Sequence, residues 1–533
     1  MRFNYFEHQH SSCRNTIFAK NGMVSTTQPL AAEAGLEILK KGGNAVDAAI
    51  ATAASLAVLE PTSNGLGGDG FAIIWYKDNL YGLNASGPSP GKISIDKVKN
   101  MGFNAMPKYG FLPVNVPGML YGWREMYKRF GVLSFKDILE PAIHYARDGY
   151  PVSPTVSYNW KKAFNIYKDR LKGAEFDEWF DTFSIDGRAP EPGEIWYSKS
   201  LSRTLEELAD SQCLSFYEGH IADKIDKFSK QYGGFISKKD LMDYRPEWVD
   251  PISTNYRGYD IWELPPNTHG LVVLLALNIL SNFDMNVDSL ELYHYMIEAM
   301  KLAYADGLNY ITDLKDMGRN LEYLLSRDYA LDRSKLIGDS AILAKHGALN
   351  TGGTVYLATA DKDGNMVSYI QSNFTGFGSG LVVPGTGISL HNRGYTFSLN
   401  EKDYNRLAPN KKTYHTIIPG FITKGDKALG PFGVMGAYMQ PQGHLQSVVN
   451  MIDFNLNPQE ALDKYRWQWI EGRRVVVEED FPEDIKNYLI HKGHDIEHSR
   501  DVGSFGRGQI ILRDGQTYIG GTEKRADGHI AAW

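Results

Sequence analysis

Four pairs of short alternating segments, each pair joined by a tight turn, most restrict how this chain can fold. Alternation is typical of strands, and turns rich in Asp, Asn, Gly and Lys between two such segments predict antiparallel hairpins. The predicted hairpins pair 71–77 with 80–84, 354–359 with 366–371, 416–423 with 428–434, and 510–512 with 517–519. Hairpins of this kind, mixed with helices, favour the α+β class.

Helical segments occupy much of the remaining chain. Gly42-Gly43-Asn44 precedes a run of small apolar residues, which predicts a loop, an Asn cap and a closely packed helix from Ala45 to Leu59. Further helices are predicted across most of 103–247, from 271, and over 444–454 and 484–491. A length of 533 residues suggests three or four domains at ~150 residues each. No repeat or low-complexity linker divides the chain, however, so we predict one large α+β unit.

Composition excludes several classes of protein. Apolar residues make up 43% and charged residues 22%, as in soluble globular proteins rather than disordered or coiled-coil chains. A net charge of −7 argues against nucleic acid as the main partner. Residues 1–18 lack the apolar core of a secretory signal, and 45–59 is too short to span a bilayer. We therefore expect a cytoplasmic protein with no membrane segment.

Motifs for the common cofactors and metals are weak or absent. Gly65 to Gly70 matches GxGxxG, but it follows a helix and precedes a strand, the reverse of a dinucleotide site, so tight packing or the wall of another site is favoured. The Walker A, HExxH and GxSxG motifs are missing. His8, His10 and Cys13 lie close together, but chain ends are usually mobile, so we expect no metal and no cofactor. Only Cys13 and Cys213 are present, too few for a disulfide framework.

The segment Thr351-Gly352-Gly353-Thr354 has two readings. It is either an ordinary loop before a strand or the site of an amino-terminal nucleophile. In the second reading the Thr354 hydroxyl attacks the preceding carbonyl, the peptide shifts to an ester, and water cuts it. The new α-amine, with a pKa of ~7.7–8.0, then serves as general base for the same hydroxyl. Upstream glycines let the scissile peptide bend.

A series of motifs running from about Asn21 to the C-terminus supports the second reading. They are GLEILKKGGNAVDAAIA (35–51), NGLGGDGF (64–71), NVPGMLYGW (115–123), EPAIHYARDGYPV (140–152), YRGYDIWELPP (256–266), AYADG (303–307), DKDGN (361–365), FGSG (377–380) and GISLHNRG (387–394). In this order they resemble the γ-glutamyltranspeptidase (glutathione hydrolase) family of amino-terminal nucleophile hydrolases. The resemblance implies a four-layer αββα sandwich, made as a proenzyme and cut into two subunits that stay together.

The resemblance also implies roles for individual residues. The family's nucleophile falls on Thr354, so the expected cleavage between Gly353 and Thr354 gives segments 1–353 and 354–533 of one interleaved αββα domain. The assisting hydroxyl falls on Ser372, where Ser in place of Thr keeps the hydrogen bond. The backbone N–H pair of the oxyanion hole falls on Gly436 and Ala437.

The residues expected to bind substrate depart from the family pattern. The family's carboxylate-binding Arg falls on Ser86, its two groups for the α-ammonium fall on Arg393 and Thr396, and its paired serines fall on His415 and Thr416. Asn373, next to Ser372, is also expected to contact substrate. Arg393 makes the pocket more positive, which suggests a second hypothesis: an acyl group that carries a carboxylate without the α-ammonium, held by the Arg393 fork.

These residues leave a small set of functions. The main expectation is a self-processing hydrolase or acyltransferase for γ-glutamyl or related acyl amides, which are small-molecule partners. The alternatives are an acylase for a carboxylate-bearing acyl group and a non-catalytic scaffold. Hydrolysis and transfer share the acyl-enzyme and differ in the acceptor, so the sequence does not separate them. The partner expected for each fragment is the other fragment, with further dimerisation left open.

Overall fold

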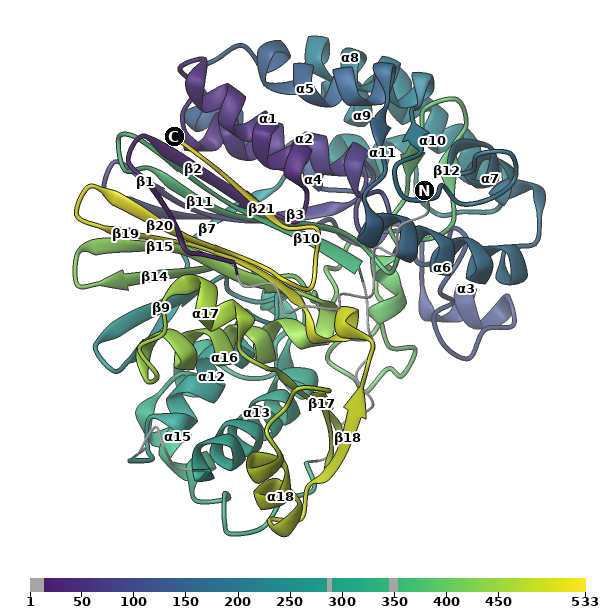
Figure 1. The fold of residues 1–533 in the computed structure, drawn as a ribbon. Helices are drawn as coiled ribbons and strands as arrows, with labels where there is room; N and C mark the ends of the chain where they lie inside the picture. Colours follow the sequence, from purple (N-terminus) through teal and green to yellow (C-terminus); the bar gives the residue numbers. More distant parts are fainter. Residues whose placement is uncertain (1–13, 285–289, 345–352) are drawn as a thin grey trace.

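The computed structural model describes residues 14–284, 290–344 and 353–533, and these residues form four layers (Figure 1). Two seven-stranded sheets pack face to face, and helices cover the outer face of each. The arrangement is the predicted αββα sandwich. His8, His10 and Cys13 lie outside the described residues.

The first sheet is antiparallel throughout and holds the strand that begins at Gly353. Its strands, in spatial order, are β21 (His529–Ala532), β2 (Gly22–Thr26), β10 (Gly353–Asp361), β11 (Met366–Phe374), β3 (Asp69–Tyr76), β4 (Asn79–Ala85) and β7 (Glu247–Val249). Strands from both sides of residue 353 therefore lie next to one another in this sheet.

The second sheet is also antiparallel and is interleaved in the same way. Its order is β1 (Ile17–Ala19), β20 (Thr517–Thr522), β19 (Arg507–Asp514), β15 (Lys427–Met435), β14 (Gly420–Lys424), β9 (Tyr259–Glu263) and β8 (Ile252–Tyr256). Neither sheet can be assigned to one segment of the chain.

Helices enclose the two sheets. The first sheet is covered by α1 (Pro29–Lys40), α2 (Ala45–Leu59) and α4 (Met119–Phe130), and α5 (Phe135–Asp148) packs on α2. The second sheet is covered by α12 (Gly270–Leu280), α16 (Gln440–Ile452) and α17 (Pro458–Asp463), and α13 (Glu291–Tyr310) packs on α12. The predicted Asn44 cap of α2 is confirmed, because its side chain accepts from the N–H groups of Val46 and Asp47. Within the described ranges, no helix combines the length and apolar character needed to cross a membrane.

The remaining elements lie outside the four layers. They are α3 (Ile95–Asn100), α6 (Pro154–Arg170), α7 (Asp177–Thr182), α8 (Lys199–Ser211), α9 (Leu214–Tyr217), α10 (His220–Gln231), α11 (Lys238–Asp243), α14 (Leu321–Leu324), α15 (Arg327–Ser334), α18 (Glu483–His491), a three-stranded sheet of β16 (Trp467–Glu471), β17 (Arg474–Glu478) and β18 (Asp495–Ser499), and the short pairs β5 (Tyr150–Pro151) with β6 (Ile195–Trp196) and β12 (Val382–Val383) with β13 (Ile388–Ser389).

Alternation along β10 sends its side chains into two apolar layers. Val355 and Leu357 join the core between the first sheet and its helices, whereas Tyr356 and Ala358 join the core between the sheets. Thr354 shares the parity of Tyr356, so its side chain belongs to the inter-sheet side. The next strand, β11, alternates likewise, and Ser372 falls on that side with Ile370.

The predicted hairpins form, with one correction. The third begins at Gly420 rather than Thr416, because Pro419 has no N–H for a strand ladder and Thr416 is engaged by Arg393. Helix α16 begins four residues before the predicted 444, with Pro441 in its first turn. The GxGxxG segment serves tight packing, since a Cβ on Gly67 would lie 2.4 Å from the Ser389 carbonyl oxygen.

Candidate active site

The ends of β10 and β11 bring two predicted hydroxyls together. Gly353 pairs with Phe374 and Val355 with Gln371, so Thr354 lies opposite two residues, Ser372 and Asn373. This is a β-bulge on β11, a feature that bends a strand and re-aims its side chains. Phe374 follows it with φ +76°, an unusual value for a residue other than glycine.

The two hydroxyls converge on one carbonyl. Thr354 Oγ1 lies 2.8 Å from the Gly353 carbonyl oxygen and 3.3 Å from Ser372 Oγ. Ser372 Oγ donates to the same carbonyl oxygen at 2.7 Å and accepts from the Phe374 N–H at 2.7 Å. Thr354 and Ser372 are both buried. The peptide between Gly353 and Thr354 therefore has the Thr354 hydroxyl beside it, and the Ser372 hydroxyl is hydrogen-bonded to its carbonyl oxygen.

The predicted oxyanion step lies at the end of β15. Gly436 has φ +143° and Ala437 has φ +50°, so the backbone turns sharply between the strand and α16. Met435, the last residue of β15, lines the same pocket as Gly353. The residue before the step and the residue before Thr354 thus border one cavity from opposite sheets.

Arg393 is a buried cation with unused donors. Its Nη1 donates to Thr416 Oγ1 at 2.7 Å, and its guanidinium carbon lies 4.1 Å from the centre of the Phe374 ring. Its Nε and Nη2 have no hydrogen-bond partner in the described part of the chain, although Arg393 is only 1% exposed. Burial lowers the pKa of Arg393 to about 9, against the opposing effect of Asp69, so the side chain is charged at neutral pH.

Asp69 and two histidines lie beside this cation. Asp69 Oδ2 accepts from His415 Nε2 at 3.0 Å, and its Oδ1 accepts from the N–H groups of Gly87 and Gly118, each at 3.3 Å. Burial alone would raise the pKa of Asp69, but His391, His415 and Arg393 hold it below its ordinary value. Burial and Arg393 lower the pKa of His415 to about 3, so its ring is neutral and its Nδ1 is an unpartnered acceptor among the described residues.

Two predicted substrate residues point elsewhere in this structure. Ser86 Oγ donates to Asn84 Oδ1 at 2.7 Å. The Asn373 amide donates to Ser389 Oγ at 2.8 Å and packs under the glycines of the 65–68 loop. The structure thus brings together Thr354, Ser372, Arg393, His415 and Thr416, and leaves Ser86 and Asn373 in neighbouring hydrogen-bond networks.

Sequence reasoning missed Phe374 and Asp69. Phe374, rather than its neighbour Asn373, packs against Arg393, because the bulge changes which residue faces the site. Asp69 had one available signal, a carboxylate between glycines at the start of an apolar strand. Its partners at 391 and 415 lie more than 300 residues away, and no local pattern links them.

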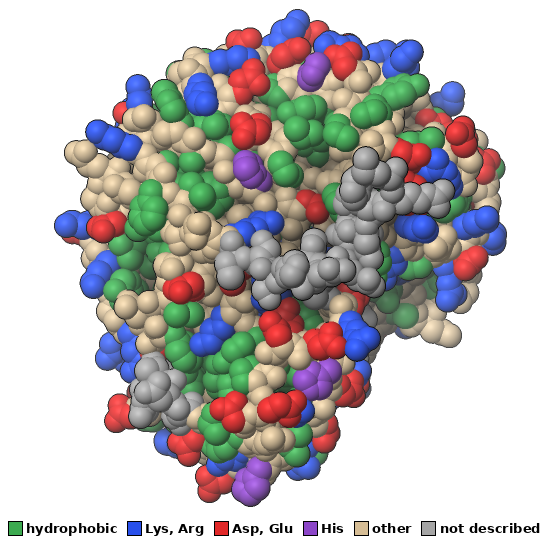
Figure 2. All heavy atoms as spheres, in the orientation of Figure 1, with side chains coloured by type: hydrophobic (Ala, Val, Ile, Leu, Met, Phe, Trp, Pro, Cys, Tyr) green, Lys and Arg blue, Asp and Glu red, His purple; other side chains and the backbone are tan. Residues whose placement is uncertain are grey.

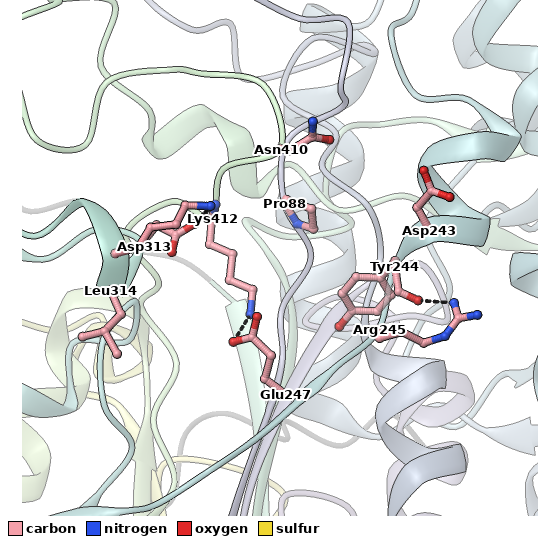
Figure 3. A pocket seen from close by; sticks show the side chains of 10 residues that line it. Pro88, Asp243, Tyr244, Arg245, Glu247, Asp313, Leu314, Asn410 and Lys412 are labelled. Atoms are coloured by element: carbon pink, nitrogen blue, oxygen red, sulfur yellow. Dashed lines mark hydrogen bonds and ion pairs between the residues drawn. The ribbon is translucent and has the colours of Figure 1, made fainter.

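Two pockets differ in their relation to these residues. A cavity of about 230 Å³ is bordered by Gly353, Thr375 and Met435. A larger hollow of about 520 Å³ lies elsewhere, between Asp313, Tyr244 and Lys412 (Figure 3). In it Lys412 Nζ pairs with Glu247 Oε2 at 2.7 Å, and neither residue of the predicted cleavage site, Gly353 or Thr354, lines it, whereas Gly353 lines the smaller cavity. The smaller cavity is therefore the better candidate for substrate.

One buried cluster has the spacing of a metal site. His294, Glu298 and His494 place ligand atoms within 4.8 Å of one another. Lys301 Nζ, however, donates to Glu298 Oε1 at 2.7 Å, and His294 Nδ1 and His494 Nε2 share a hydrogen bond of 2.9 Å. Glu298 Oε2 also accepts from the Ile342 N–H at 3.0 Å. Internal hydrogen bonds thus engage these groups, and the adjacent ammonium opposes a cation.

Comparison with known proteins identifies the family of this chain. Residues 31–533 match the Gamma-glutamyltranspeptidase family model. A cephalosporin acylase structure from Bacillus halodurans superposes with a TM-score of 0.97 at 53% identity, covering 100% of this chain and 99% of that one. The glutathione hydrolase-like YwrD proenzyme of Bacillus subtilis is 36% identical, over 96% of this chain and 98% of its own length. The acylase ACY 1 proenzyme of Pseudomonas sp. (strain V22) is 31% identical, over 95% and 92%. The chain therefore belongs to the γ-glutamyltranspeptidase family.

Proposed function

We propose that this protein is a self-processing amide hydrolase or acyltransferase whose preferred acyl group carries a carboxylate and no α-ammonium. The family membership supports cleavage of an amide bond. The relatives include proteins named as acylases and as a glutathione hydrolase-like proenzyme, so both kinds of acyl group are candidates. The observation that carries the acyl preference is Arg393, which is buried and whose Nε and Nη2 have no hydrogen-bond partner among the described residues.

Self-cleavage begins at the Gly353–Thr354 peptide. Thr354 Oγ attacks the Gly353 carbonyl carbon while Ser372 Oγ donates to the carbonyl oxygen, where negative charge develops. The C–N bond breaks, the Thr354 nitrogen takes the hydroxyl proton, and an ester remains. Water hydrolyses that ester and leaves a carboxylate on Gly353 and a free α-amine on Thr354.

Turnover repeats this chemistry on a substrate amide. The α-amine accepts the Thr354 hydroxyl proton as Oγ attacks the substrate carbonyl, and the backbone N–H groups of Gly436 and Ala437 stabilise the oxyanion. The amide C–N bond breaks, the leaving amine takes the proton, and the acyl group stays on Thr354 as an ester. Water or an acceptor amine then releases it.

Recognition of the acyl group follows from the charges around Arg393. A carboxylate would accept from Nε and Nη2 and relieve two unpaired donors, each costing ~1–3 kcal/mol when buried. Among the described residues, the carboxylate beside Arg393 is Asp69, and both of its oxygens already accept hydrogen bonds, so an α-ammonium would compete with His415 and two backbone N–H groups for it. A γ-glutamyl group is the second candidate, favoured by the unpartnered His415 Nδ1, which could accept from an ammonium.

Kinetics with three 4-nitroanilides separate these acyl groups. Glutaryl, γ-glutamyl and butyryl derivatives share a leaving group and differ only in carboxylate and ammonium. We expect kcat/KM to be highest for glutaryl, and Arg393→Lys, which loses the fork, to lower it by ~10-fold or more while changing the butyryl value little. Mass spectrometry should find the acyl adduct on Thr354. A clear γ-glutamyl preference would overturn the acyl assignment, and absence of any adduct would overturn the mechanism.

A further inference from the structure

Asp69 is a buried carboxylate whose two oxygens have different partners. Its Oδ1 accepts from the backbone N–H groups of Gly87 and Gly118, each at 3.3 Å. Its Oδ2 faces two imidazole rings, with His415 Nε2 at 3.0 Å and His391 Nδ1 at 3.5 Å. Although burial would raise the pKa of Asp69, the two rings and the nearby guanidinium hold it below its ordinary value. The carboxylate is therefore ionised and can only accept hydrogen bonds.

The partners of the two rings decide where each ring carries its proton. His391 Nε2 lies 3.0 Å from the Asn115 carbonyl oxygen, which only accepts, so the proton is on Nε2 and Nδ1 is bare. His415 Nε2 faces the Asp69 carboxylate and therefore donates to it. Burial and Arg393 lower the pKa of His415 to about 3, so its ring is neutral and its Nδ1 is also bare.

The bare Nδ1 of His415 lies in the same site as Arg393. Thr416, the residue after His415, accepts from Arg393 Nη1 at 2.7 Å. His415 Nδ1, Arg393 Nε and Arg393 Nη2 are all buried, and none has a hydrogen-bond partner among the described residues. The site thus offers two donors and one acceptor to whatever binds there.

A carboxylate alone would satisfy only part of this set. Its oxygens would accept from Arg393 Nε and Nη2, but His415 Nδ1 needs a hydrogen from the ligand. An ammonium would supply one, but its charge would be repelled by the adjacent guanidinium in a buried site. A hydroxyl supplies the hydrogen without a charge.

We infer that Asp69 is a positioning residue that holds the His415 proton on Nε2, so that Nδ1 accepts from a hydroxyl on the carbon next to the acyl carboxylate. This inference rests on the proposed function and narrows its substrate class to amides of α-hydroxy dicarboxylic acids. His415 would touch the acyl group, whereas Asp69 would act through His415.

Asp69→Asn should reverse the His415 ring. The Asn oxygen must remain on the N–H groups of Gly87 and Gly118, because an amide NH₂ there would meet two donors. Its NH₂ group then faces His415 Nε2 and the bare His391 Nδ1, and it donates to them. The His415 proton must move to Nδ1, which becomes a donor in the acyl site.

Binding of three dicarboxylates to the processed protein tests this reversal. Glutarate has no group on the carbon next to the carboxylate, 2-hydroxyglutarate has a donor there, and the oxo group of 2-oxoglutarate only accepts. In the wild type we expect the better enantiomer of 2-hydroxyglutarate to bind about tenfold tighter than glutarate, as for one buried acceptor satisfied, and 2-oxoglutarate to bind no tighter than glutarate. In Asp69→Asn, 2-oxoglutarate should bind about tenfold tighter than glutarate. Titration calorimetry gives each Kd without relying on turnover.

NMR of the histidine rings gives a readout that a loss of stability alone would not produce. Long-range proton–nitrogen spectra distinguish a ring protonated on Nε2 from one protonated on Nδ1. The His415 signals, assigned by their absence in His415→Gln, should show protonated Nε2 in the wild type and protonated Nδ1 in Asp69→Asn. An unchanged ring in Asp69→Asn would overturn the positioning role.

Two further variants separate the acceptor from the buried carboxylate. In His415→Gln the amide nitrogen can replace Nε2 on Asp69, but no acceptor replaces Nδ1, so the three acids should bind with similar Kd values. Asp47→Asn is the matched control, because Asp47 is also a buried carboxylate and accepts backbone N–H groups, including those of Val132 and Leu133. Its order of affinities should be that of the wild type.

The outcomes distinguish this inference from the proposed function. Equal Kd values for glutarate and 2-hydroxyglutarate in the wild type would overturn the inference and leave Arg393 as the carboxylate site. The same order of affinities in the wild type and Asp69→Asn would also overturn it. If none of the three acids bound, both the inference and the acyl preference of the proposed function would be wrong.

Discussion

At the scale of single residues, the site depends on donors placed before any substrate arrives. Ser372 Oγ already donates to the Gly353 carbonyl oxygen, and two nitrogen atoms of Arg393, Nε and Nη2, have no acceptor in the described part of the chain. Buried donors left unpaired cost free energy in the uncut chain. Under the proposed function, Arg393 recovers that cost when a carboxylate binds, and Ser372, already hydrogen-bonded to the scissile carbonyl, stabilises the oxyanion as its charge develops.

Removing the Ser372 hydroxyl should slow self-cleavage. Ser372→Ala loses the donor on the scissile carbonyl, and loss of one such donor typically costs ~10²–10³ in rate. Ser372→Thr should retain most of the rate. The measurement is a time course on a denaturing gel, following conversion of the full chain to fragments 1–353 and 354–533.

Ser368→Ala provides the comparison for this experiment. Ser368 is buried on the same face of β11, four residues away, and its Oγ lies 2.8 Å from the Tyr356 hydroxyl. Its loss removes a hydroxyl from the same strand without touching the scissile peptide. Equal cleavage rates for the two alanine variants would contradict the role of Ser372.

At the scale of elements, the ends of strands rather than their middles build the site. Thr354 is the second residue of β10, and Ser372 is two residues before the end of β11. Asp69 is the first residue of β3, and Gly436 follows β15. Regular pairing within each sheet holds these ends in register, and the bulge on β11 and the turn after β15 adjust the final geometry.

Strain at the end of β15 should be coupled to catalysis. Gly436 has φ +143°, and the Cβ of Gly436→Ala would lie 3.0 Å from Gly506 Cα. The turn must therefore shift, and its N–H groups would no longer point toward the expected position of the oxyanion. We expect kcat for anilide hydrolysis to fall by ~10²-fold, with a stability loss of ~1–2 kcal/mol.

Gly425→Ala tests whether strain alone explains the loss. Gly425 has φ +57° in the turn just before β15 and has open space around it. This variant should be strained by a similar amount while kcat stays near the wild-type value. Similar losses of kcat in both variants would show that the position of Gly436 has no special importance.

Local signals in the sequence account for the elements that were predicted correctly. Hairpins and the capped helix at 45–59 depend on neighbouring residues, so alternation and turn chemistry reveal them. The bulge on β11 has no such local signal. It shifts the strand register by one residue, so Phe374 lies at the site where the sequence predicted Asn373. Which side chain partners Asp69 or Arg393 depends on contacts between distant segments, which no local pattern encodes.

At the scale of the whole molecule, the four layers bury ionisable groups in large numbers. His415, His444 and His494 are buried and neutral, because burial lowers the pKa values to about 3, about 3 and about 2. In the unfolded chain each histidine would bind a proton below its ordinary pKa of ~6.5. On the surface face shown in Figure 2, acidic and basic side chains are interspersed.

Stability should therefore fall as the pH falls below about 6.5. The folded-state pKa values of these histidines are depressed, so below that pH the unfolded state binds more protons than the folded state. Each histidine then contributes a loss of about 1.4 kcal/mol of unfolding free energy per pH unit. Replacing His494 by Gln should reduce the slope by about one histidine's share, measured by urea denaturation between pH 6.5 and 4.5.

An exposed histidine serves as the reference for that slope. His144 lies on α5 with a side chain 56% exposed beside Asp148. Its replacement by Gln should leave the dependence on pH as in the wild type. If His494→Gln and His144→Gln gave the same slope as the wild type, buried histidines would not be the source of acid sensitivity.

The place of β10 has a consequence for how such a protein can be made. This strand is third of seven in its sheet, with β2 and β11 bonded to either side, so a cut before Thr354 leaves a chain end in the middle of the molecule. Two halves translated separately would have to thread their strands between one another. Synthesis as a single polypeptide avoids that assembly problem and fixes the stoichiometry of the halves at one to one in every molecule.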